Sequence, residues 1–262
     1  MCCLFGIIDY RHSLSSWQMN KVLSVLAAAC EERGTDATGI AYNNSAHLQI
    51  YKRPKAAHRM HFDVPKDVHV VMGHTRMATQ GVARKNYNNH PFSGHVKGMD
   101  FALAHNGVLY NDETLRESRH LPKTKIETDS YIAVQLLENK KSLDFNSLKT
   151  MAEDLMGSFT ITVMDGQDNV YFVRGDNPLC LYHFPHRGLY LYASTEAILM
   201  KVLSQLGMVG EMATHIDLRS GDILRIDAAG IMRRGKFDDS NLCSYYPMYS
   251  SCYTYDNYGR NA

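Results

Sequence analysis

Apolar residues at the start of the chain follow two successive patterns. Residues 3–9 form a short, nearly continuous apolar run, which predicts a buried strand. Over residues 19–27, apolar side chains then recur three and four positions apart, which is the spacing of an amphipathic helix. Ser15 or Ser16 can cap that helix, and Gly34 can end it. A strand followed directly by a helix therefore opens the fold.

Strand-like runs dominate the remainder, and further helices fall in two separate groups. Predicted strands cover residues 39–42, 47–51, 68–72, 101–104, 158–164, 170–174, 179–183, 188–193, 222–227 and 230–235. Predicted helices cover residues 128–137, 142–156 and 196–206, with Ser142 capping the second of them. Strands that mostly follow one another predict an α+β fold of stacked, mostly antiparallel sheets covered by helices, since alternating βαβ units would need a helix after each strand.

Two connections differ in character. Residues 43–46 read as a four-residue turn joining the two strands of a hairpin. Residues 75–98 lack periodicity and are rich in Asn, His and Gly, and long loops of this kind are usually functional. We therefore expect functional residues in this region and at the strand ends that flank it.

The length of 262 residues allows a full core and lies at the upper end for one domain. We predict a single domain over residues 2–236. From residue 237 to 262 the sequence changes, with six tyrosines scattered among Ser, Asn, Cys and Asp. A segment without alternation of this kind is predicted to be a disordered tail.

Charge and cysteine content narrow the function. The net charge is +1, from 28 basic and 27 acidic side chains, which gives no general attraction for nucleic acid or an anionic membrane. No apolar run approaches the ~20 residues that span a bilayer, and no signal peptide is evident. The six cysteines form no C-x-x-C pair, so we predict reduced thiols, no metal, no cofactor and a cytoplasmic location.

Cys2, directly after the initiator methionine, is the candidate nucleophile. Removal of Met1 would leave Cys2 with both a thiol and a free α-amine. An unperturbed thiol titrates near ~8.5 and an α-amine near ~7.7 to 8.0, so the amine can accept the thiol proton at neutral pH. This is the N-terminal variant of an activated nucleophile. The alternative is a cysteine that only fills apolar space.

Three later segments offer partners for such a nucleophile. Arg76 follows a predicted strand and can grip a carboxylate with two hydrogen bonds, although a surface salt bridge is the alternative. Asn106 and Gly107 can form an oxyanion hole from a side-chain amide and a backbone N–H, although Asn-Gly is also a common turn. Asp129 can meet a cationic group of a ligand or cap a helix.

Taken in order, these segments resemble the class II glutamine amidotransferases, which are N-terminal-nucleophile hydrolases. The resemblance covers about residues 2–196. Seven motifs carry it: Met-Cys-x-x-x-Gly at the start, Arg33-Gly34-x-Asp36-Ala37-x-Gly39, Gly73-His74-Thr75-Arg76, Asn89-His90-Pro91-Phe92, His105-Asn106-Gly107, Thr128-Asp129-Ser130 and Ala193-Ser194-Thr195-Glu196.

The resemblance implies an activity and a role for each group. Cys2 would attack the side-chain amide of L-glutamine, giving a thioester and ammonia, and water would then release glutamate. Arg76 would hold the α-carboxylate of glutamine and Asp129 its α-ammonium group. Asn106 and Gly107 would form the oxyanion hole.

The same resemblance implies a four-layer αββα sandwich and a mobile lid over residues 77–95. We also predict that Thr79 and His105 belong to the substrate-binding residues. Two positions depart from the family pattern. Cys3 stands where a glycine commonly follows the nucleophile, and Met77 stands where several members have Trp or Tyr.

The partner of such a domain is left open by the sequence. Amidotransferases of this class usually carry a second domain that uses the ammonia, and no P-loop, nucleotide fingerprint or second core follows residue 236. We predict a glutaminase subunit that supplies a separate synthase, or a free-standing amidohydrolase. The alternatives are an N-terminal-cysteine hydrolase of another linear amide, or a non-catalytic binding or regulatory module in which Met1 is retained.

Overall fold

The computed structural model describes residues 2–242, and within them thirteen strands form two sheets. The strands are β1 (Cys3–Asp9), β2 (Ala37–Asn44), β3 (His47–Arg53), β4 (Val70–Arg76), β5 (Phe92–Val96), β6 (Met99–Leu109), β7 (Gly157–Asp165), β8 (Val170–Arg174), β9 (Cys180–Phe184), β10 (Leu189–Ala193), β11 (Thr214–His215), β12 (Asp222–Ile226) and β13 (Met232–Lys236). The helices are α1 (Ser16–Cys30), α2 (Asp112–Ser118), α3 (Tyr131–Lys140), α4 (Phe145–Asp154) and α5 (Glu196–Gln205), with short 3₁₀ helices at Ala57–Arg59 and Asn86–Asn88.

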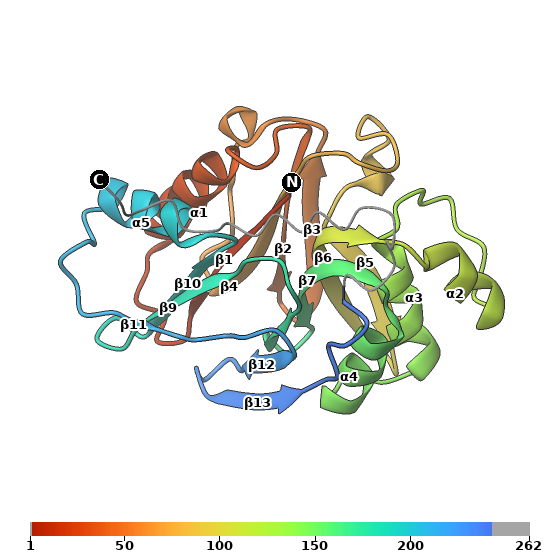
Figure 1. The fold of residues 1–262 in the computed structure, drawn as a ribbon. Coiled ribbons are helices and arrows are strands. Elements are labelled where there is room, and N and C mark those ends of the chain that lie inside the picture. The colour runs from red at the N-terminus through yellow and green to blue at the C-terminus, as the bar shows by residue number, and fades with distance from the viewer. Residues whose placement is uncertain (1, 243–262) are drawn as a thin grey trace, which may run out of the picture.

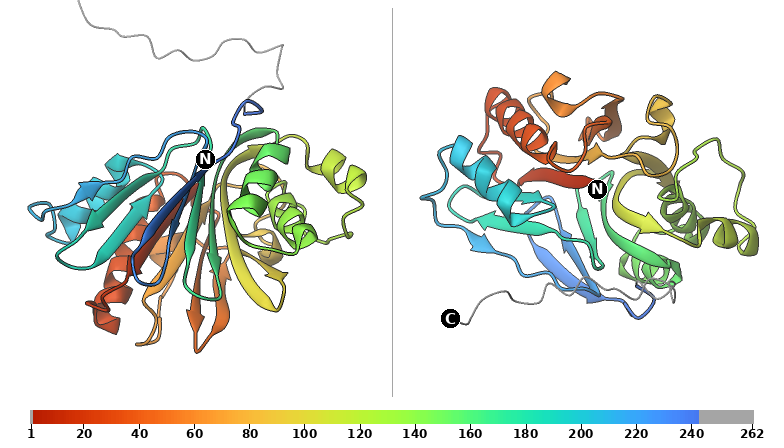
Figure 2. Two further views of the ribbon diagram at one scale, coloured as in Figure 1. Left: turned by 90° about the horizontal axis from the view of Figure 1, so that it is seen from below. Right: turned by 45° about the horizontal axis from the view of Figure 1, so that its top comes forward.

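The two sheets are stacked between two layers of helices (Figures 1 and 2). One sheet has the strand order β11-β9-β10-β1-β4-β2-β3, the other β13-β12-β8-β7-β6-β5, and the strand pairs within both are antiparallel. Helices α1 and α5 cover the first sheet, and α2, α3 and α4 lie on the side of the second (Figure 1). The predicted αββα sandwich is confirmed.

The alternation of side chains along β1 explains why this strand is apolar throughout. Cys3, Phe5 and Ile7 pack under the helices, whereas Leu4 and Ile8 enter the core between the sheets. Both faces of the central strand are therefore buried, and an uninterrupted apolar run is the sequence that such a strand needs. Cys3, with no exposed surface, is a core residue of the helix side.

The first helix begins where the sequence predicts. Ser15 is its N-cap, and its side chain accepts a hydrogen bond from the backbone N–H of Gln18, whose own side chain accepts from the N–H of Ser15. This reciprocal capping box satisfies two backbone donors at the helix start. The cap predicted for the later helix at Ser142 is wrong, because Asp144 caps α4 through Ser147.

The hairpin of β2 and β3 is tighter than predicted. Asn44 pairs with His47, so the turn contains only Ser45 and Ala46, both with positive φ angles of 50° and 63°. A two-residue turn with this left-handed backbone matches the twist of the flanking strands. The predicted four-residue turn was therefore wrong in length.

Strand β5 lies inside the stretch that showed no periodicity. Phe92, Gly94 and Val96 face inward and alternate with exposed Ser93 and His95. Glycine and histidine in this short run hide the alternation that would have identified the strand. The predicted lid over residues 77–95 is corrected accordingly, since its last residues pair with β6.

The packing of the domain continues past β13. Phe237 is buried and stacks on Phe159 with ring centroids 5.9 Å apart, and Leu242 forms a bridge with Gly157. Residues 243–262, most of the predicted tail, lie outside the described residues. The division of the chain at residue 236 stays a prediction. Within residues 2–242, no helix combines the length and the apolar character that crossing a membrane requires.

Candidate active site

A cavity of about 270 Å³ collects the predicted catalytic residues. Cys2 contributes from the residue before β1, Asn106 and Gly107 from β6, and Thr79 from the loop after β4. Three segments of the predicted site, far apart in sequence, therefore meet at one end of the sandwich. Its wall also includes Met77, Val108, Tyr110, Ser158 and Asn177.

Cys2 lies on the inner side of its sheet. Because side chains alternate along a strand, Cys2 faces the same way as Leu4, toward the second sheet. Its thiol donates to the backbone oxygen of Met77, with an S···O distance of 3.6 Å, and its own carbonyl accepts from Arg33 Nε at 2.8 Å. Burial raises the pKa of the Cys2 thiol, and the positive charge of Arg76 opposes that shift. A thiolate at neutral pH therefore needs a base.

Asn106 faces Cys2 from the second sheet. It pairs with Thr160 of β7 and is 1% exposed, and its Nδ2 has no hydrogen-bond partner within residues 2–242. Leaving a buried amide donor unpaired costs about 1–3 kcal/mol, so such a group calls for an explanation. An amide donor on a residue that lines the same cavity as a thiol is suited to donate to the oxygen of a bound carbonyl compound.

Gly107 is fixed by sterics. Its φ is 148°, and an added Cβ would lie 1.8 Å from the backbone oxygen of Ser158. Only glycine fits so close to β7. Asn106 and Gly107 lie within β6, which continues to Leu109, so the alternative reading of this dipeptide as a turn is wrong.

His105 lies behind Asn106 instead of on the cavity wall formed by the described residues. Its Nδ1 is 2.8 Å from Ser130 Oγ, and its backbone oxygen is 3.0 Å from His74 Nε2. Burial lowers the pKa of His105. This side chain links β6 to the start of α3, and its predicted role in substrate binding stays a prediction.

Arg76 ends β4 and is only 3% exposed. It donates to Asn89 Oδ1 at 2.8 Å and to the backbone oxygens of Gln80 at 2.5 Å and Gly81 at 3.0 Å. These partners are neutral oxygens, so the surface salt bridge considered from the sequence is not what forms. A guanidinium has five N–H donors, and these bonds use three of them. Through these bonds, Arg76 holds the loop that follows β4 folded over the guanidinium group.

Asp129 lies just before α3, and hydrogen bonds hold both of its carboxylate oxygens. Its Oδ2 accepts from the backbone N–H of Leu109 at 2.7 Å, and its Oδ1 accepts from Ser130 Oγ at 3.3 Å. The N-cap of α3 is Ser130, so Asp129 is not the helix cap. Burial lowers the pKa of Arg76, and the charge of Asp129 opposes that shift. The same charge adds to the rise that burial causes in the pKa of the Cys2 thiol, so the three groups are electrostatic neighbours.

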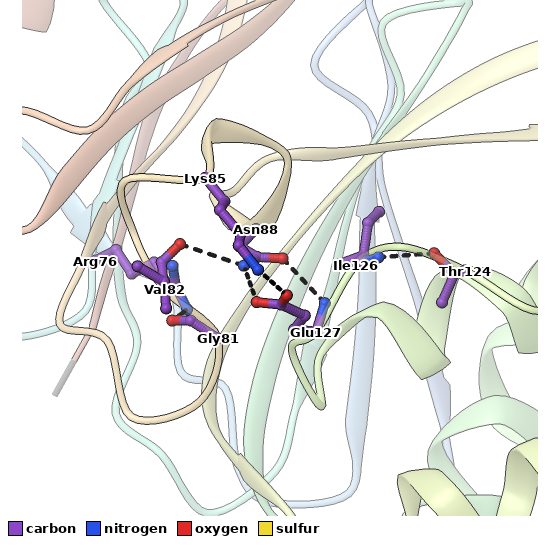
Figure 3. Close-up of polar contacts among 8 residues, drawn as sticks. All are labelled: Arg76, Gly81, Val82, Lys85, Asn88, Thr124, Ile126 and Glu127. Carbon is purple, nitrogen blue, oxygen red and sulfur yellow. Dashed lines mark hydrogen bonds and ion pairs between the residues drawn. The ribbon is translucent and has the colours of Figure 1, made fainter.

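A second polar cluster anchors the loop that follows Arg76 (Figure 3). Asn88 Oδ1 accepts from the backbone N–H of Glu127 at 2.9 Å, while Asn88 Nδ2 donates to Glu127 Oε2 at 2.8 Å and to the backbone oxygen of Val82 at 3.2 Å. Lys85 adds an ion pair with Glu127. Because Glu127 lies two residues before Asp129, the loop over Arg76 is tied to the segment that carries Asp129.

Sequence reasoning missed the wall formed by Ser158 and Asn177. Asn177 Nδ2 donates to Ser158 Oγ at 2.6 Å, and the backbone oxygen of Asn177 accepts from Thr160 Oγ1 at 2.6 Å and from Arg174. The available signal was a polar, glycine-containing segment directly after the strand that ends at Arg174.

Most of the chain is similar to known proteins. A family model described as a glutamine amidotransferase domain matches residues 74–201. The glutamine–fructose-6-phosphate aminotransferase (isomerizing) of Sulfurisphaera tokodaii is 29% identical over 241 residues, covering 86% of this chain and 40% of that protein. The enzyme of the same name from Chlamydia muridarum is 31% identical over 244 residues, covering 90% and 36%.

Two solved structures share the fold. The glutamine phosphoribosylpyrophosphate amidotransferase of B. subtilis aligns with a TM-score of 0.71 at 20% identity, covering 90% of this chain and 49% of that one. A structure described as the allosteric regulatory enzyme of purine biosynthesis aligns with a TM-score of 0.72 at 20% identity, with the same coverage. This chain spans less than half the length of these relatives. The family match, the alignments and the αββα sandwich identify the chain as a member of the class II glutamine amidotransferases, with the N-terminal-nucleophile hydrolase fold.

Proposed function

We propose that this chain hydrolyses the side-chain amide of L-glutamine through a thioester on Cys2, releasing glutamate and ammonia. The observation that carries the proposal is the convergence of the Cys2 thiol and the unpartnered amide of Asn106 on one cavity. A nucleophile facing a donor for the developing oxyanion is the minimum requirement of acyl transfer. Membership of the glutamine amidotransferase family supports glutamine as the amide.

The proposed reaction uses the nucleophile on one side of the cavity and the oxyanion donors on the other. After removal of Met1, the α-amine of Cys2 takes the thiol proton, and the sulfur attacks the amide carbon. The carbonyl oxygen becomes an oxyanion that accepts from Asn106 Nδ2 and the backbone N–H of Gly107, each donor supplying roughly 3 kcal/mol. The C–N bond breaks as the ammonium form of the amine returns its proton to the leaving nitrogen. Water then attacks the thioester, giving glutamate and the free thiol.

Binding of the amino-acid end would involve the charges behind the cavity. Arg76 would take the α-carboxylate and Asp129 the α-ammonium group, and Thr79 would contact the substrate from the cavity wall. The guanidinium of Arg76 now donates to the backbone oxygens of Gln80 and Gly81. A carboxylate is the stronger acceptor, so glutamine would replace these oxygens and move the loop. Substrate binding and lid movement would then be one event, with His105 positioning Asn106 from behind.

Intact mass after treatment with a glutamine-shaped electrophile tests the proposal. We expect a protein that has lost one methionine and gains a single adduct, with excess L-glutamine preventing the addition. The measurement reports processing and thiol reactivity together. A protein that retains Met1 and takes up no reagent would instead favour the non-catalytic binding or regulatory module.

Replacing Arg76 or Asp129 with alanine separates glutamine from other linear amides. Each change is expected to lower kcat/KM for glutamine roughly 10- to 100-fold, because a hydrogen bond to a charged group is worth about 1.5–3 kcal/mol. Steady-state ammonia release measures the effect, and Arg84→Ala, at an exposed arginine of the same loop, is the matched control. Undiminished glutamine turnover in both variants would point to a hydrolase of a different amide.

The fate of the ammonia is a further part of the proposal. The relatives named above are an aminotransferase and an amidotransferase, which supports transfer of the ammonia to a second substrate. We propose a synthase as the recipient, in a separate subunit as the sequence predicts. A cytoplasmic location remains a prediction from the sequence.

A further inference from the structure

Lys52 of β3 is a half-buried charged side chain that the proposed reaction does not use. Its Nζ donates to the backbone oxygens of Asn89 at 2.5 Å and Pro91 at 2.9 Å, and lies 5.1 Å from the centre of the Phe92 ring. No carboxylate within residues 2–242 forms an ion pair with it. Lys52 is half-buried, and a cation in such a place whose partners are two carbonyls and a ring is costly, so a specific role is expected.

The segment that Lys52 holds contains the main side-chain partner of Arg76. Asn89 has no exposed surface, and its Nδ2 donates to the backbone oxygen of Ala83 at 2.8 Å and to Asn86 Oδ1 at 3.2 Å. These bonds turn Asn89 Oδ1 toward Arg76, which donates to it at 2.8 Å. The chain of contacts therefore runs from the ammonium through the backbone of Asn89 to the guanidinium.

We propose that Lys52 is a positioning residue for glutamine: by fixing the backbone at Asn89 and Pro91, it keeps the Arg76 guanidinium directed at the site of the α-carboxylate. This inference rests on the proposed function. Lys52 contacts neither the reacting sulfur nor the oxyanion donors, so its effect falls on binding of glutamine and leaves the chemical step unchanged. Arginine at this position can still donate to both carbonyls, whereas methionine fills the space without donating.

The first measurement compares the KM and kcat of Lys52 variants. For Lys52→Met we expect KM for glutamine to rise about tenfold with kcat within about twofold, which is the pattern of binding lost equally in the ground state and the transition state. Lys52→Arg is expected to recover most of the affinity. Lys55→Met, at an exposed lysine three residues further on, is the matched control and keeps the wild-type KM.

The second measurement is the pH dependence of KM. Burial, together with the charge of Arg76, lowers the pKa of Lys52 to about 8. The other titratable groups facing it are the guanidinium of Arg76, which stays charged, and His74 and His90, whose pKa values burial lowers, that of His74 to about 3. KM of the wild type is expected to rise as the pH passes 8, because a neutral amine donates more weakly. Lys52→Arg flattens this rise.

The comparison of the wild type with Lys52→Arg isolates Lys52. The thiol and α-amine of Cys2 titrate in both proteins, so their contribution cancels in the ratio of the two profiles. Two results with an active wild type would overturn this inference and leave the proposed function standing. One is a wild-type KM in Lys52→Met, and the other is a pH dependence of KM in Lys52→Arg that equals that of the wild type. If Lys52→Met does not fold, the profiles of the other two proteins decide. A wild type that neither hydrolyses nor binds L-glutamine would refute the proposed function and this inference together.

Discussion

Replacing Cys2 with alanine is expected to lower glutamine hydrolysis at least about 10⁴-fold, because the variant keeps the oxyanion donors and loses the nucleophile. The α-amine remains at residue 2 after Met1 removal, so any residual rate reports attack by water alone. Ammonia and glutamate release in steady state measure the loss. Glutamine affinity is expected to persist, since Arg76 and Asp129 are untouched.

The neighbouring thiol provides the control for this experiment. Cys3 faces the core under the helices, on the side of β1 opposite to Leu4. Cys3→Ala is therefore expected to reduce the free energy of unfolding while glutamine turnover continues. If Cys2→Ala retained wild-type turnover, or Cys3→Ala abolished it in a folded protein, the nucleophile would have to be reassigned.

The elements that sequence predicted best are those with local signals. The apolar run of β1 reflects a strand that is buried on both faces. The three-and-four spacing of α1 reflects a helix that is buried on one face, and Ser15 with Gln18 marks the start of this helix. Helix and strand periods are properties of short segments, so a single sequence reveals them. The αββα layering required more, because the stacking of two sheets depends on contacts between distant strands.

The sequence predicted the surroundings of the catalytic candidates better than those of the substrate-binding candidates. Cys2, Asn106 and Gly107 were predicted together, and one cavity holds all three. Arg76 and Asp129 were predicted to grip the substrate, yet in this conformation most of their partners are backbone groups of the loop and of β6, beside one side chain each. Such partners depend on where a loop folds back, and no periodicity or motif encodes that position.

Contacts made through the backbone account for most of what sequence reasoning missed. Lys52 binds two carbonyl oxygens, and Asn177 is fixed by donors to its own carbonyl. A carbonyl is present at every position of the chain, so neither partner leaves a trace in the sequence. The Asn-Gly pair misleads for a related reason: Gly107 is required by the approach of Ser158 from the neighbouring strand, and the same dipeptide serves turns elsewhere.

Replacing Asn106 with alanine is expected to separate catalysis from stability. Loss of one oxyanion donor lowers kcat about 10²- to 10³-fold with little change in KM, because the donor acts mainly on the developing charge. The Nδ2 group is buried without a partner, so its removal relieves a cost of about 1–3 kcal/mol. The free energy of unfolding is therefore expected to stay level or rise while turnover falls. Steady-state kinetics and denaturant unfolding of the same preparation measure both.

A second buried asparagine makes the comparison sharp. Asn43 Nδ2 donates to the backbone oxygen of Asp165 and to Asp168 Oδ1, each at 2.8 Å, far from the cavity wall. Asn43→Ala is expected to lower the free energy of unfolding by about 1–3 kcal/mol and to leave kcat unchanged. The two variants should thus show opposite patterns. If Asn106→Ala behaved like Asn43→Ala, Asn106 would be a structural amide, and the oxyanion would have to be stabilised by Gly107 with some other donor on the cavity wall.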